Sequence, residues 1–357
     1  MVYMYTRCIQ YIAQVRVPCV LRGHGAEGFL GDGGSMGQVN ADLVTLREIR
    51  DAGRVIGKAA RHTPLSPLTT LRRGEVYGKC ENLQVTGSFK IRGAYNKISR
   101  LPSSCPGVVA YSSGNHAMAV AYSARACGFR ARIVMPRTAL SRKVEGTRAL
   151  GAEVILTGTT SEDLRKRAER EVARDGFVLV HPFDDRFVIA GQGTLGLEIL
   201  KDLPGVKAVV VAMSGGGLAS GVATAIKERR PGVQVFGVEP RGADRMSRSL
   251  KAGRPITLSR ADSVADGLCA LRPGDLTFAH LRRYLDGVIS VTDGEILETA
   301  RELLLREQLV VEPSGAAASA AIRSGRLRLP PGPVVVLLSG GNADIRRILD
   351  SKEADGE

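Results

Sequence analysis

Residues 81–94 read ENLQVTGSFKIRGA, and this stretch determines how the rest of the chain is interpreted. Residues 86–88, Thr-Gly-Ser, predict a turn with a capping hydroxyl, followed by a helix. Lys90 would lie in the first turn of that helix, between Phe89 and Ile91. A helix N-terminus disfavours a cation, and partial burial lowers the pKa of a lysine. We therefore expect a neutral amine at Lys90, which can attack a carbonyl and form a Schiff base.

Apolar runs typical of strands alternate with helical patterns along most of the chain. Glycines such as Gly128, Gly151 and Gly176 would end several of the helices. Strands that alternate with crossover helices predict an α/β fold, in which helices cover both faces of parallel sheets. The expected strands are residues 107–112, 130–136, 152–157, 177–181, 208–213, 234–238, 288–291 and 334–339.

The first predicted helix marks where the organised part of the chain begins. Residues 45–48, Thr-Leu-Arg-Glu, have the form of a capping box. Upstream, residues 1–36 combine broken apolar runs with a glycine-rich stretch, which predicts a disordered N-terminal extension. A weak boundary near residues 182–185 would separate two lobes. We predict a large domain from residues 37–106 and 185–357, and a small domain from residues 107–184.

Three loops that directly follow apolar runs lie where parallel sheets bind ligands. Residues 111–116, Tyr-Ser-Ser-Gly-Asn-His, place small residues before a helix, where free N–H groups suit a carboxylate. Residues 214–218, Ser-Gly-Gly-Gly-Leu, let backbone N–H groups converge on a phosphate with no Cβ in the way. Residues 339–342, Ser-Gly-Gly-Asn, offer a hydroxyl that can hydrogen-bond a ring nitrogen. Each loop alone could be an ordinary turn, so the combination carries the indication of a site.

The lysine stretch and the three loops closely resemble, in the same order, the motifs of fold-type II pyridoxal-phosphate enzymes. The chain is most similar to their threonine/serine dehydratase and serine racemase branch. The resemblance covers roughly residues 46–349. It implies a two-lobed fold like that of tryptophan synthase β, with parallel-rich twisted sheets flanked by helices, and pyridoxal 5′-phosphate as the cofactor. The C-terminal regulatory domain of biosynthetic threonine dehydratases is expected to be missing. Three positions depart from the usual pattern, namely Val85, Met118 and Ser214.

The resemblance also implies roles for individual residues. Lys90 would hold the cofactor in the large domain as a Schiff base and take the Cα proton of the substrate. Ser113 stands where racemases have a second acid/base, although dehydratases can carry it too. A neutral partner such as Ser339 at the pyridine nitrogen would favour β-elimination. The implied substrate-binding residues are Ser112, Ser113, Gly114, Asn115 and His116. The implied cofactor-binding residues are Phe89, Lys90, Asn115, Ser214, Gly215, Gly216, Gly217, Leu218, Gly267, Glu312 and Ser339.

The implied reaction is the dehydration and deamination of a β-hydroxy amino acid, such as L-threonine or L-serine, to a 2-oxo acid and ammonia. Serine racemisation and hydroxyaspartate dehydration stay open as alternatives, because the sequence does not reveal what contacts the β-substituent. A nicotinamide dehydrogenase is disfavoured, since Ser220 occupies the last position of the required G-x-G-x-x-G pattern. An amino-acid-binding protein without catalysis is disfavoured by the intact Lys90.

Composition and charge narrow the class of partner. The net charge of +14 could attract a polyanion, yet basic residues are interleaved with acidic ones and aromatic residues make up only 4%. Nucleic-acid binding is therefore disfavoured. No run approaches the roughly 18 apolar residues of a membrane helix. Six cysteines without a C-x-x-C pair or zinc-ligand spacing favour reduced thiols in the cytoplasm. The expected partner is an amino-acid substrate, and the resemblance implies a homo-oligomer, either a dimer or a tetramer.

We expect no bound metal. In the racemase branch, a divalent cation near the phosphate loop is held by a Glu, a backbone carbonyl and an acidic side chain. The matching positions here are Glu239, Ala243 and Arg245. A guanidinium cannot ligate a cation and would repel one. We expect Arg245 to pair with Glu239 instead, and the side chain of Asp244 to point elsewhere.

Overall fold

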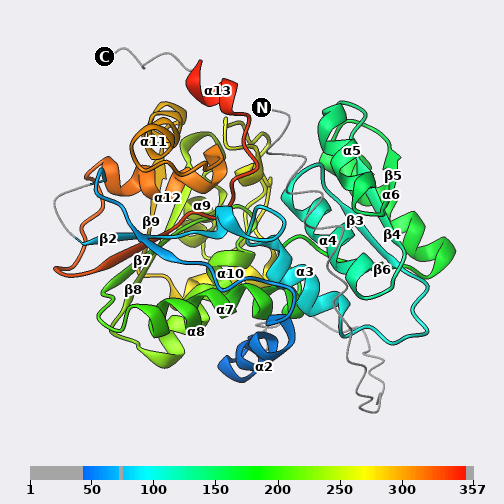
Figure 1. The fold of residues 1–357 in the computed structure, drawn as a ribbon, viewed down its shortest axis with the longest axis horizontal. Helices are drawn as coiled ribbons and strands as arrows, with labels where there is room; N and C mark the ends of the chain where they lie inside the picture. Colours follow the sequence, from blue (N-terminus) through cyan, green and yellow to red (C-terminus); the bar gives the residue numbers. More distant parts are fainter. Residues whose placement is uncertain (1–42, 72–74, 351–357) are drawn as a thin grey trace.

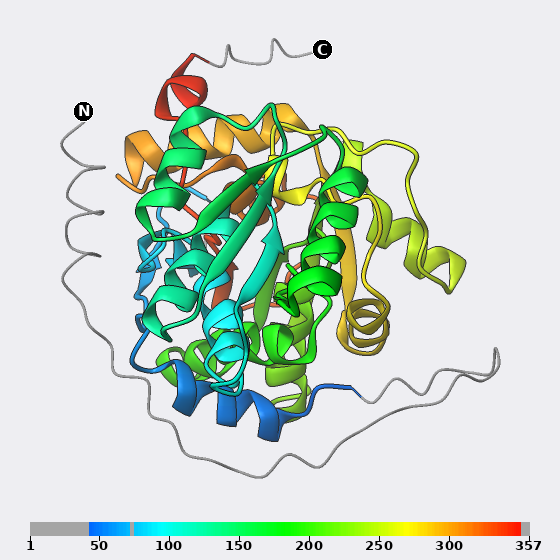
Figure 2. The ribbon, with the colours of Figure 1, turned by 90° about the vertical axis from the view of Figure 1, so that its right-hand side faces the viewer.

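The structure is a computed structural model, and it describes residues 43–71 and 75–350. It contains two sheets, each covered by helices (Figures 1 and 2). The larger sheet has the strand order β1-β2-β10-β7-β8-β9, and the smaller has the order β5-β4-β3-β6. Strand pairing in the described residues is parallel, except for the antiparallel pair of β1 with β2. The predicted α/β fold with parallel-rich sheets is confirmed.

The strands of the larger sheet are β1 (Leu65–Pro67), β2 (Val76–Lys79), β7 (Ala208–Ala212), β8 (Gln234–Pro240), β9 (Gly287–Val291) and β10 (Val334–Leu337). Those of the smaller sheet are β3 (Val108–Tyr111), β4 (Ala131–Met135), β5 (Glu153–Leu156) and β6 (Val178–Leu179). The helices are α2 (Leu46–Ile56), α3 (Lys90–Ile98), α4 (Asn115–Ala126), α5 (Ser141–Ala149), α6 (Ser161–Asp175), α7 (Arg186–Asp202), α8 (Gly217–Arg229), α9 (Arg245–Ala252), α10 (Asp275–Tyr284), α11 (Asp293–Arg306), α12 (Pro313–Arg323) and α13 (Ile345–Leu349). Short 3₁₀ turns are η1 (Glu81–Leu83), η2 (Arg241–Ala243) and η3 (Asp266–Leu268).

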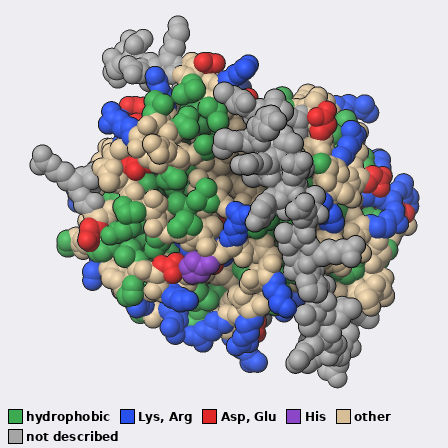
Figure 3. All heavy atoms as spheres, in the orientation of Figure 1, with side chains coloured by type: hydrophobic (Ala, Val, Ile, Leu, Met, Phe, Trp, Pro, Cys, Tyr) green, Lys and Arg blue, Asp and Glu red, His purple; other side chains and the backbone are tan. Residues whose placement is uncertain are grey.

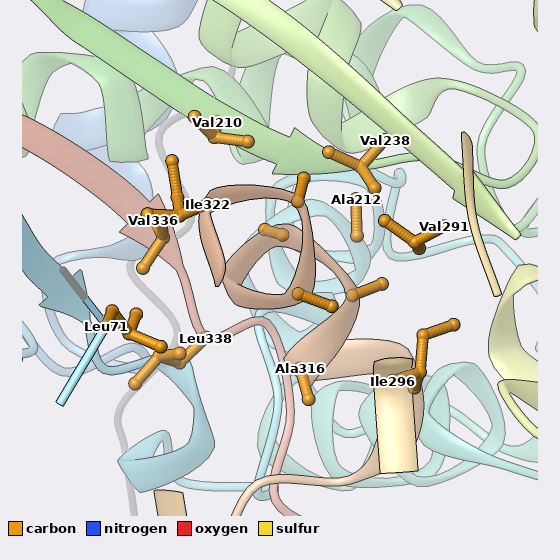
Figure 4. Close-up of a cluster of buried hydrophobic side chains, with 14 of the residues drawn as sticks. Leu71, Val210, Ala212, Val238, Val291, Ile296, Ala316, Ile322, Val336 and Leu338 are labelled. Atoms are coloured by element: carbon orange, nitrogen blue, oxygen red, sulfur yellow. The ribbon is translucent and has the colours of Figure 1, made fainter. Parts of the chain in front are cut away.

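The larger sheet is buried on both faces, which is why its strands read as unbroken apolar runs. In β7, Val210 and Ala212 face one side and pack against α12 (Figure 4). The alternate residues Val209 and Val211 face the other side, in a cluster with residues of α7, α8 and α10. The α12 segment is rich in buried alanine, so this helix can lie close to the sheet. The resulting core holds the carboxyl ends of the parallel strands in fixed positions.

The smaller sheet is covered by α4 on one face and by α6 on the other. Val108 and Ala110 of β3 belong to the first cluster, and Val109 belongs to the second with Leu164 of α6. Helix α3 packs against both α4 and α7, so the helix that begins at Lys90 connects the two halves of the molecule. Lys90 therefore lies where the two sheets meet.

Several local predictions are confirmed and others need correction. Thr45 and Glu48 form the predicted capping box of α2. The segment 177–181 forms only the two-residue strand β6, and β1 and β2 were not predicted. The two sheets lie within the predicted large and small domains, whose exact bounds remain a prediction. The predicted extension, residues 1–36, lies outside the described residues.

Candidate active site

Backbone hydrogen bonds join the lysine stretch to the loop after β10. The Phe89 N–H donates to the Ser339 carbonyl at 3.1 Å, and the Gly341 N–H donates to the Gly87 carbonyl at 2.8 Å. Ser88 also forms an isolated β-bridge with Gly340. These bonds hold two segments together that are about 250 residues apart in the sequence.

The predicted cap of α3 needs correction. The N-cap residue is Phe89, and no side chain caps the helix. The Ser88 hydroxyl is buried without a hydrogen-bond partner in the described chain. Gly87 does form a turn, with a φ of +72°. A Cβ at Gly87 would also lie 2.4 Å from the Asn342 Oδ1, so both conformation and space require glycine there.

Arg92, two residues after the lysine, forms buried ion pairs that hold the lysine stretch in place. Its buried guanidinium donates to both carboxylate oxygens of Glu81, each at 2.8 Å, and to Glu198 of α7 at 2.6 and 3.0 Å. Removing one partner of such a buried pair would leave an uncompensated charge. Glu81 and Arg92 therefore hold the two ends of the lysine stretch against α7.

The Lys90 side chain is partly buried and points to the chain segment before α7. Its Nζ donates to the Pro182 carbonyl at 2.6 Å, and it lies 5.2 Å from the centroid of the Phe89 ring. Burial lowers the pKa of Lys90 from 10.5 to about 8. A fraction of the amine is thus neutral near pH 7, as a Schiff-base lysine requires.

Asn115 connects the loop after β3 to two further segments. Its Nδ2 donates to the Glu312 carboxylate at 2.5 Å, and its Oδ1 accepts from Asn342 Nδ2 at 2.7 Å. Asn342 also donates to the Thr86 carbonyl at 3.0 Å. Burial raises the pKa of Glu312 to about 7. The orientation of the Asn115 amide is thus fixed by partners on both of its polar atoms.

The remaining residues of the first loop lie around the N-terminus of α4. The Ser112 hydroxyl accepts from the Gly114 N–H at 3.2 Å, and Ser113 is half-buried. The His116 ring is buried, with its Nε2 2.8 Å from the Val180 carbonyl. Burial, and then the charge of Lys90, lower the pKa of His116 to about 3. A neutral imidazole turned toward β6 makes His116 a support for the loop.

The glycine loop precedes α8, with Gly216 as the N-cap residue at a φ of +104°. The Gly215 carbonyl accepts from Thr277 Oγ1 at 2.6 Å, and the Ser214 hydroxyl accepts from the Ala270 N–H at 3.3 Å. Within residues 43–71 and 75–350, the backbone N–H groups of Gly215 and Gly216 donate to no protein acceptor. Unpaired N–H groups at a helix N-terminus fit a phosphate.

Other predicted residues complete the surroundings of these loops. Leu218 is buried in the first turn of α8. The Gly267 N–H donates to Ser314 Oγ at 3.0 Å, which ties η3 to α12. Ser339 is buried at the end of β10, and its hydroxyl makes no hydrogen bond to another described residue. The segments that carry these residues are linked by hydrogen bonds. Phe89, beside Lys90, donates to the Ser339 carbonyl, and Glu312 accepts from Asn115.

A model of the family described as "Pyridoxal-phosphate dependent enzyme" matches residues 56–340. The chain belongs to this family. It is 44% identical over 311 residues to the L-threonine ammonia-lyase of Thermotoga maritima, covering 86% of this chain and 77% of that protein. The crystal structure of a threonine deaminase from T.th. is 42% identical, covers 84% of this chain and 99% of that one, and has a TM-score of 0.81. Maize serine racemase is 36% identical, covers 86% and 96%, and has a TM-score of 0.83.

As a pyridoxal-phosphate-dependent enzyme, the chain has the fold-type II architecture and the cofactor that the sequence predicted. The nicotinamide dehydrogenase alternative is wrong. The residues present fit the cofactor, because unpaired N–H groups of the glycine loop suit its phosphate and the Lys90 amine suits its aldehyde. In the described ranges, no helix is long and apolar enough to cross a membrane.

Sequence reasoning missed residues that support these loops of the pyridoxal-phosphate enzyme. Pro182 accepts from Lys90, and Phe183 lies so close that a Cβ at Gly215 would be 2.4 Å from its ring. Thr277 holds the Gly215 carbonyl from α10. These contacts join distant segments without a local motif. Asn342 was quoted as part of the 339–342 loop without a role. Its side-chain amide could have indicated a hydrogen bond to a neighbouring loop.

Arg245 lies where the metal comparison placed it. Its guanidinium is fully buried, 3.9 Å from the Glu239 carboxylate, and donates to the Ala243 carbonyl at 2.5 Å and to the Leu268 carbonyl. Asp244 turns away and pairs with Arg248 at 2.8 Å. The Arg245 guanidinium thus contacts the Glu239 carboxylate and the Ala243 carbonyl, the two groups that the resemblance to the racemase branch matched to metal ligands.

Proposed function

We propose that this pyridoxal-phosphate-dependent enzyme is a threonine/serine ammonia-lyase, which converts a β-hydroxy amino acid to a 2-oxo acid and ammonia. The proposal is supported by the hydrogen bonds that tie the lysine stretch and the Asn115 side chain to the loop after β10, beside a buried Lys90 amine. The names of the threonine ammonia-lyase and threonine deaminase relatives support the same reaction.

In this proposal, the protein holds cofactor and substrate by separate loops. The N–H groups of Ser214 to Leu218 bind the cofactor phosphate, Asn115 meets the ring hydroxyl, and Ser339 meets the ring nitrogen. Residues 112–116, including the half-buried Ser113, bind the substrate carboxylate at the N-terminus of α4. Phe89, Gly267 and Glu312 surround the ring. When bound, the cofactor supplies the electron sink for the carbanion at Cα.

Lys90 carries the proton transfer in this proposal. Its Nζ takes the proton from Cα, and the β-hydroxyl leaves with a second proton as water. The resulting enamine becomes an imine and hydrolyses, so the water lost is regained and the net products are a 2-oxo acid and ammonia. A pKa near 8 suits the task, because the free amine is accessible close to neutral pH.

The test is the release of 2-oxo acid by the cofactor-loaded protein from L-threonine, L-serine and 3-hydroxyaspartate. We expect 2-oxobutanoate from L-threonine at the highest rate, since two relatives named for threonine share 42–44% identity with this chain. Cofactor-stripped protein is the control. Failure of all three amino acids to yield a 2-oxo acid would overturn the proposal.

Racemisation is the second candidate, because Ser113 is half-buried in the loop before α4 and the maize serine racemase is structurally similar. Chiral analysis of residual serine in the same assay separates the two reactions. We expect 2-oxo acid to exceed D-serine. Replacing Ser113 by alanine should remove any D-serine that does form.

We further propose that the protein acts in the cytoplasm as a homo-oligomer. Among the described residues, Cys80, Cys105 and Cys269 are free thiols, which fits a reducing compartment. On the face shown in Figure 3, hydrophobic side chains gather at the left, where Figure 1 shows β2 and α12. An extended apolar patch of this kind fits a subunit interface. Light scattering at several protein concentrations tests the oligomeric state.

Metal ions should not affect turnover. Arg245 already places a buried positive charge beside Glu239, so a divalent cation would meet repulsion there. We expect activity within about twofold of the untreated enzyme in excess chelator, with monovalent salt held constant. Activity that is lost in chelator and restored by Mg²⁺ would contradict this, and would implicate Asp244 or another carboxylate.

A further inference from the structure

A cavity lies outside the candidate active site, on the surface formed by η2, the start of α9 and the segment that follows α9. Its volume is about 440 Å³. The lining residues are Arg241, Gly242, Asp244, Arg248, Ile256, Thr257, Leu258, Ser259 and Arg260. None of them belongs to the residues proposed for the cofactor or the substrate. Three guanidinium groups around one cavity indicate affinity for anions.

The pairing of these arginines leaves donors available. Arg248 uses its Nε on Asp244, and Arg260 uses Nη2 on Asp262 at 2.5 Å. Arg241 is exposed and has no hydrogen bond or ion pair with any described residue. Each guanidinium has five N–H donors, so Arg248 and Arg260 also keep unused ones. The arginine donors exceed what the two carboxylates can take.

The cavity walls are held by backbone contacts and contain few other charges. The Asp262 N–H donates to the Gly242 carbonyl at 3.0 Å, and the Leu258 N–H donates to the Leu271 carbonyl at 2.9 Å. The Ile256 N–H donates to Ser249 Oγ at 2.8 Å. These bonds attach the segment after α9 to η2 and to α9 itself. A fixed wall with arginines at its rim lowers the ordering cost of binding an anion.

The N-terminus of α9 does not supply the binding groups. The N–H groups of Met246 and Ser247, the second and third residues of the helix, already donate to the Glu239 carboxylate at 2.8 and 3.0 Å. Glu239 lies on the core side of this turn, together with Arg245. An anion in the cavity must therefore be held by the arginine side chains and by the hydroxyls of Thr257 and Ser259.

We propose that this cavity binds a small multivalent oxyanion, a phosphate compound or a polycarboxylate, at a site separate from the active site. Arg241, Arg248 and Arg260 supply the charge, and the buried Leu258 and half-buried Ile256 offer an apolar wall for a short carbon skeleton. The same turn of α9 carries Arg248 toward the cavity and Arg245 toward the Met213 and Leu268 carbonyls. Helix α9 therefore lines the cavity through Arg248 and contacts, through Arg245, the Met213 residue that directly precedes the 214–218 loop.

The test is calorimetric titration of the full chain, loaded with pyridoxal phosphate, with inorganic pyrophosphate at low ionic strength. The bound cofactor blocks its own phosphate site. We expect one saturable site per chain, which weakens as NaCl is added. Arg241→Gln should weaken binding about tenfold, and Arg241→Gln with Arg260→Gln about a hundredfold, since each removes a charged hydrogen-bond donor. Citrate in a parallel titration distinguishes a phosphate site from a polycarboxylate site.

Arg328→Gln is the matched control, because it removes the same charge from an exposed position that does not line the cavity. Melting temperature and the cofactor absorbance band report whether each variant is folded and loaded. Absence of saturable binding by both probes would overturn the proposal. Equal weakening in Arg328→Gln and Arg241→Gln would also overturn it, since general charge attraction would then explain the binding. Neither result depends on the amino-acid substrate.

Discussion

Replacing Lys90 by alanine should lower turnover by about 10³-fold or more, because loss of a positioned general base alone costs roughly 10²–10⁴-fold. The variant should still bind pyridoxal phosphate through the glycine loop, but without a covalent link. The absorbance band of the lysine-bound cofactor, which borohydride removes, should therefore be absent. Alanine is favourable at the start of α3, so we expect the variant to fold.

Lys97→Ala is the matched control for this experiment. Lys97 lies about two turns further along the same helix and pairs with Asp185 at 2.9 Å. This control should keep the absorbance band and most of the turnover. Near-normal turnover in Lys90→Ala would show that another residue performs the proton transfer, and the proposed site would then be wrong.

The pH dependence of cofactor attachment gives an independent test of Lys90. The pKa of this amine in the cofactor-free protein lies at about 8, below the ordinary lysine value of 10.5, because burial disfavours its charge. Only the neutral amine attacks the cofactor aldehyde. The rate of reconstitution should thus rise as the pH increases and level off above about 8. A rate that keeps rising to pH 10 would indicate a solvated lysine.

The lysine stretch and the three loops could be predicted because each depends on local chemistry. Apolar runs as long as residues 208–213 exist only because both faces of β7 are buried, and the loops that follow them must lie at the carboxyl edge. The capping box at Thr45 likewise needs only residues three positions apart. Local patterns of this kind were therefore enough to predict the fold class and the location of the candidate site.

Features that depend on distant partners could not be predicted. The strand β2, Val76–Lys79, includes a glycine and a lysine, and it forms because β10 pairs with it in parallel. The buried Lys79 is accepted there because its Nζ lies 2.7 Å from the Glu198 carboxylate of α7. The capping hydroxyl predicted within residues 86–88, such as that of Ser88, is absent for a similar reason. A β-bridge to Gly340 holds that residue, so its hydroxyl does not reach the helix.

A departure from the family pattern proved as informative as a match. Arg245 was singled out because the resemblance to the racemase branch implies an acidic side chain at that position, and that difference predicted an ion pair with Glu239. The structure has this pair, at 3.9 Å, and adds contacts to the Ala243 and Leu268 carbonyls that no pattern indicated. The arginine at position 245 was thus enough to predict its ion pair with Glu239. Its hydrogen bonds to the backbone carbonyls became evident only from the structure.

Gly216→Asp should weaken pyridoxal-phosphate binding by at least about 100-fold. Gly216 has a φ of +104°, where a side chain costs roughly 1–3 kcal/mol of strain. A Cβ would lie 2.9 Å from both Leu281 Cδ1 and Thr277 Cβ. The new carboxylate would also repel a phosphate bound at the N-terminus of α8, by several kcal/mol at about 4 Å in a partly buried site. Because each 1.4 kcal/mol is about tenfold, the repulsion alone exceeds the stated loss.

Two further variants separate these causes. Gly216→Ala introduces the strain and the Cβ without the charge, so it should bind the cofactor better than Gly216→Asp but worse than the parent chain. Gly232→Asp places the same carboxylate at an exposed glycine whose Cβ would contact nothing within 4 Å, and it should keep the parent Kd. Cofactor titration monitored by absorbance measures all three, and melting of the cofactor-free proteins reports folding. If folded Gly216→Asp kept the parent Kd, the phosphate would have to bind elsewhere, because a buried anion cannot be indifferent to a carboxylate at its binding loop.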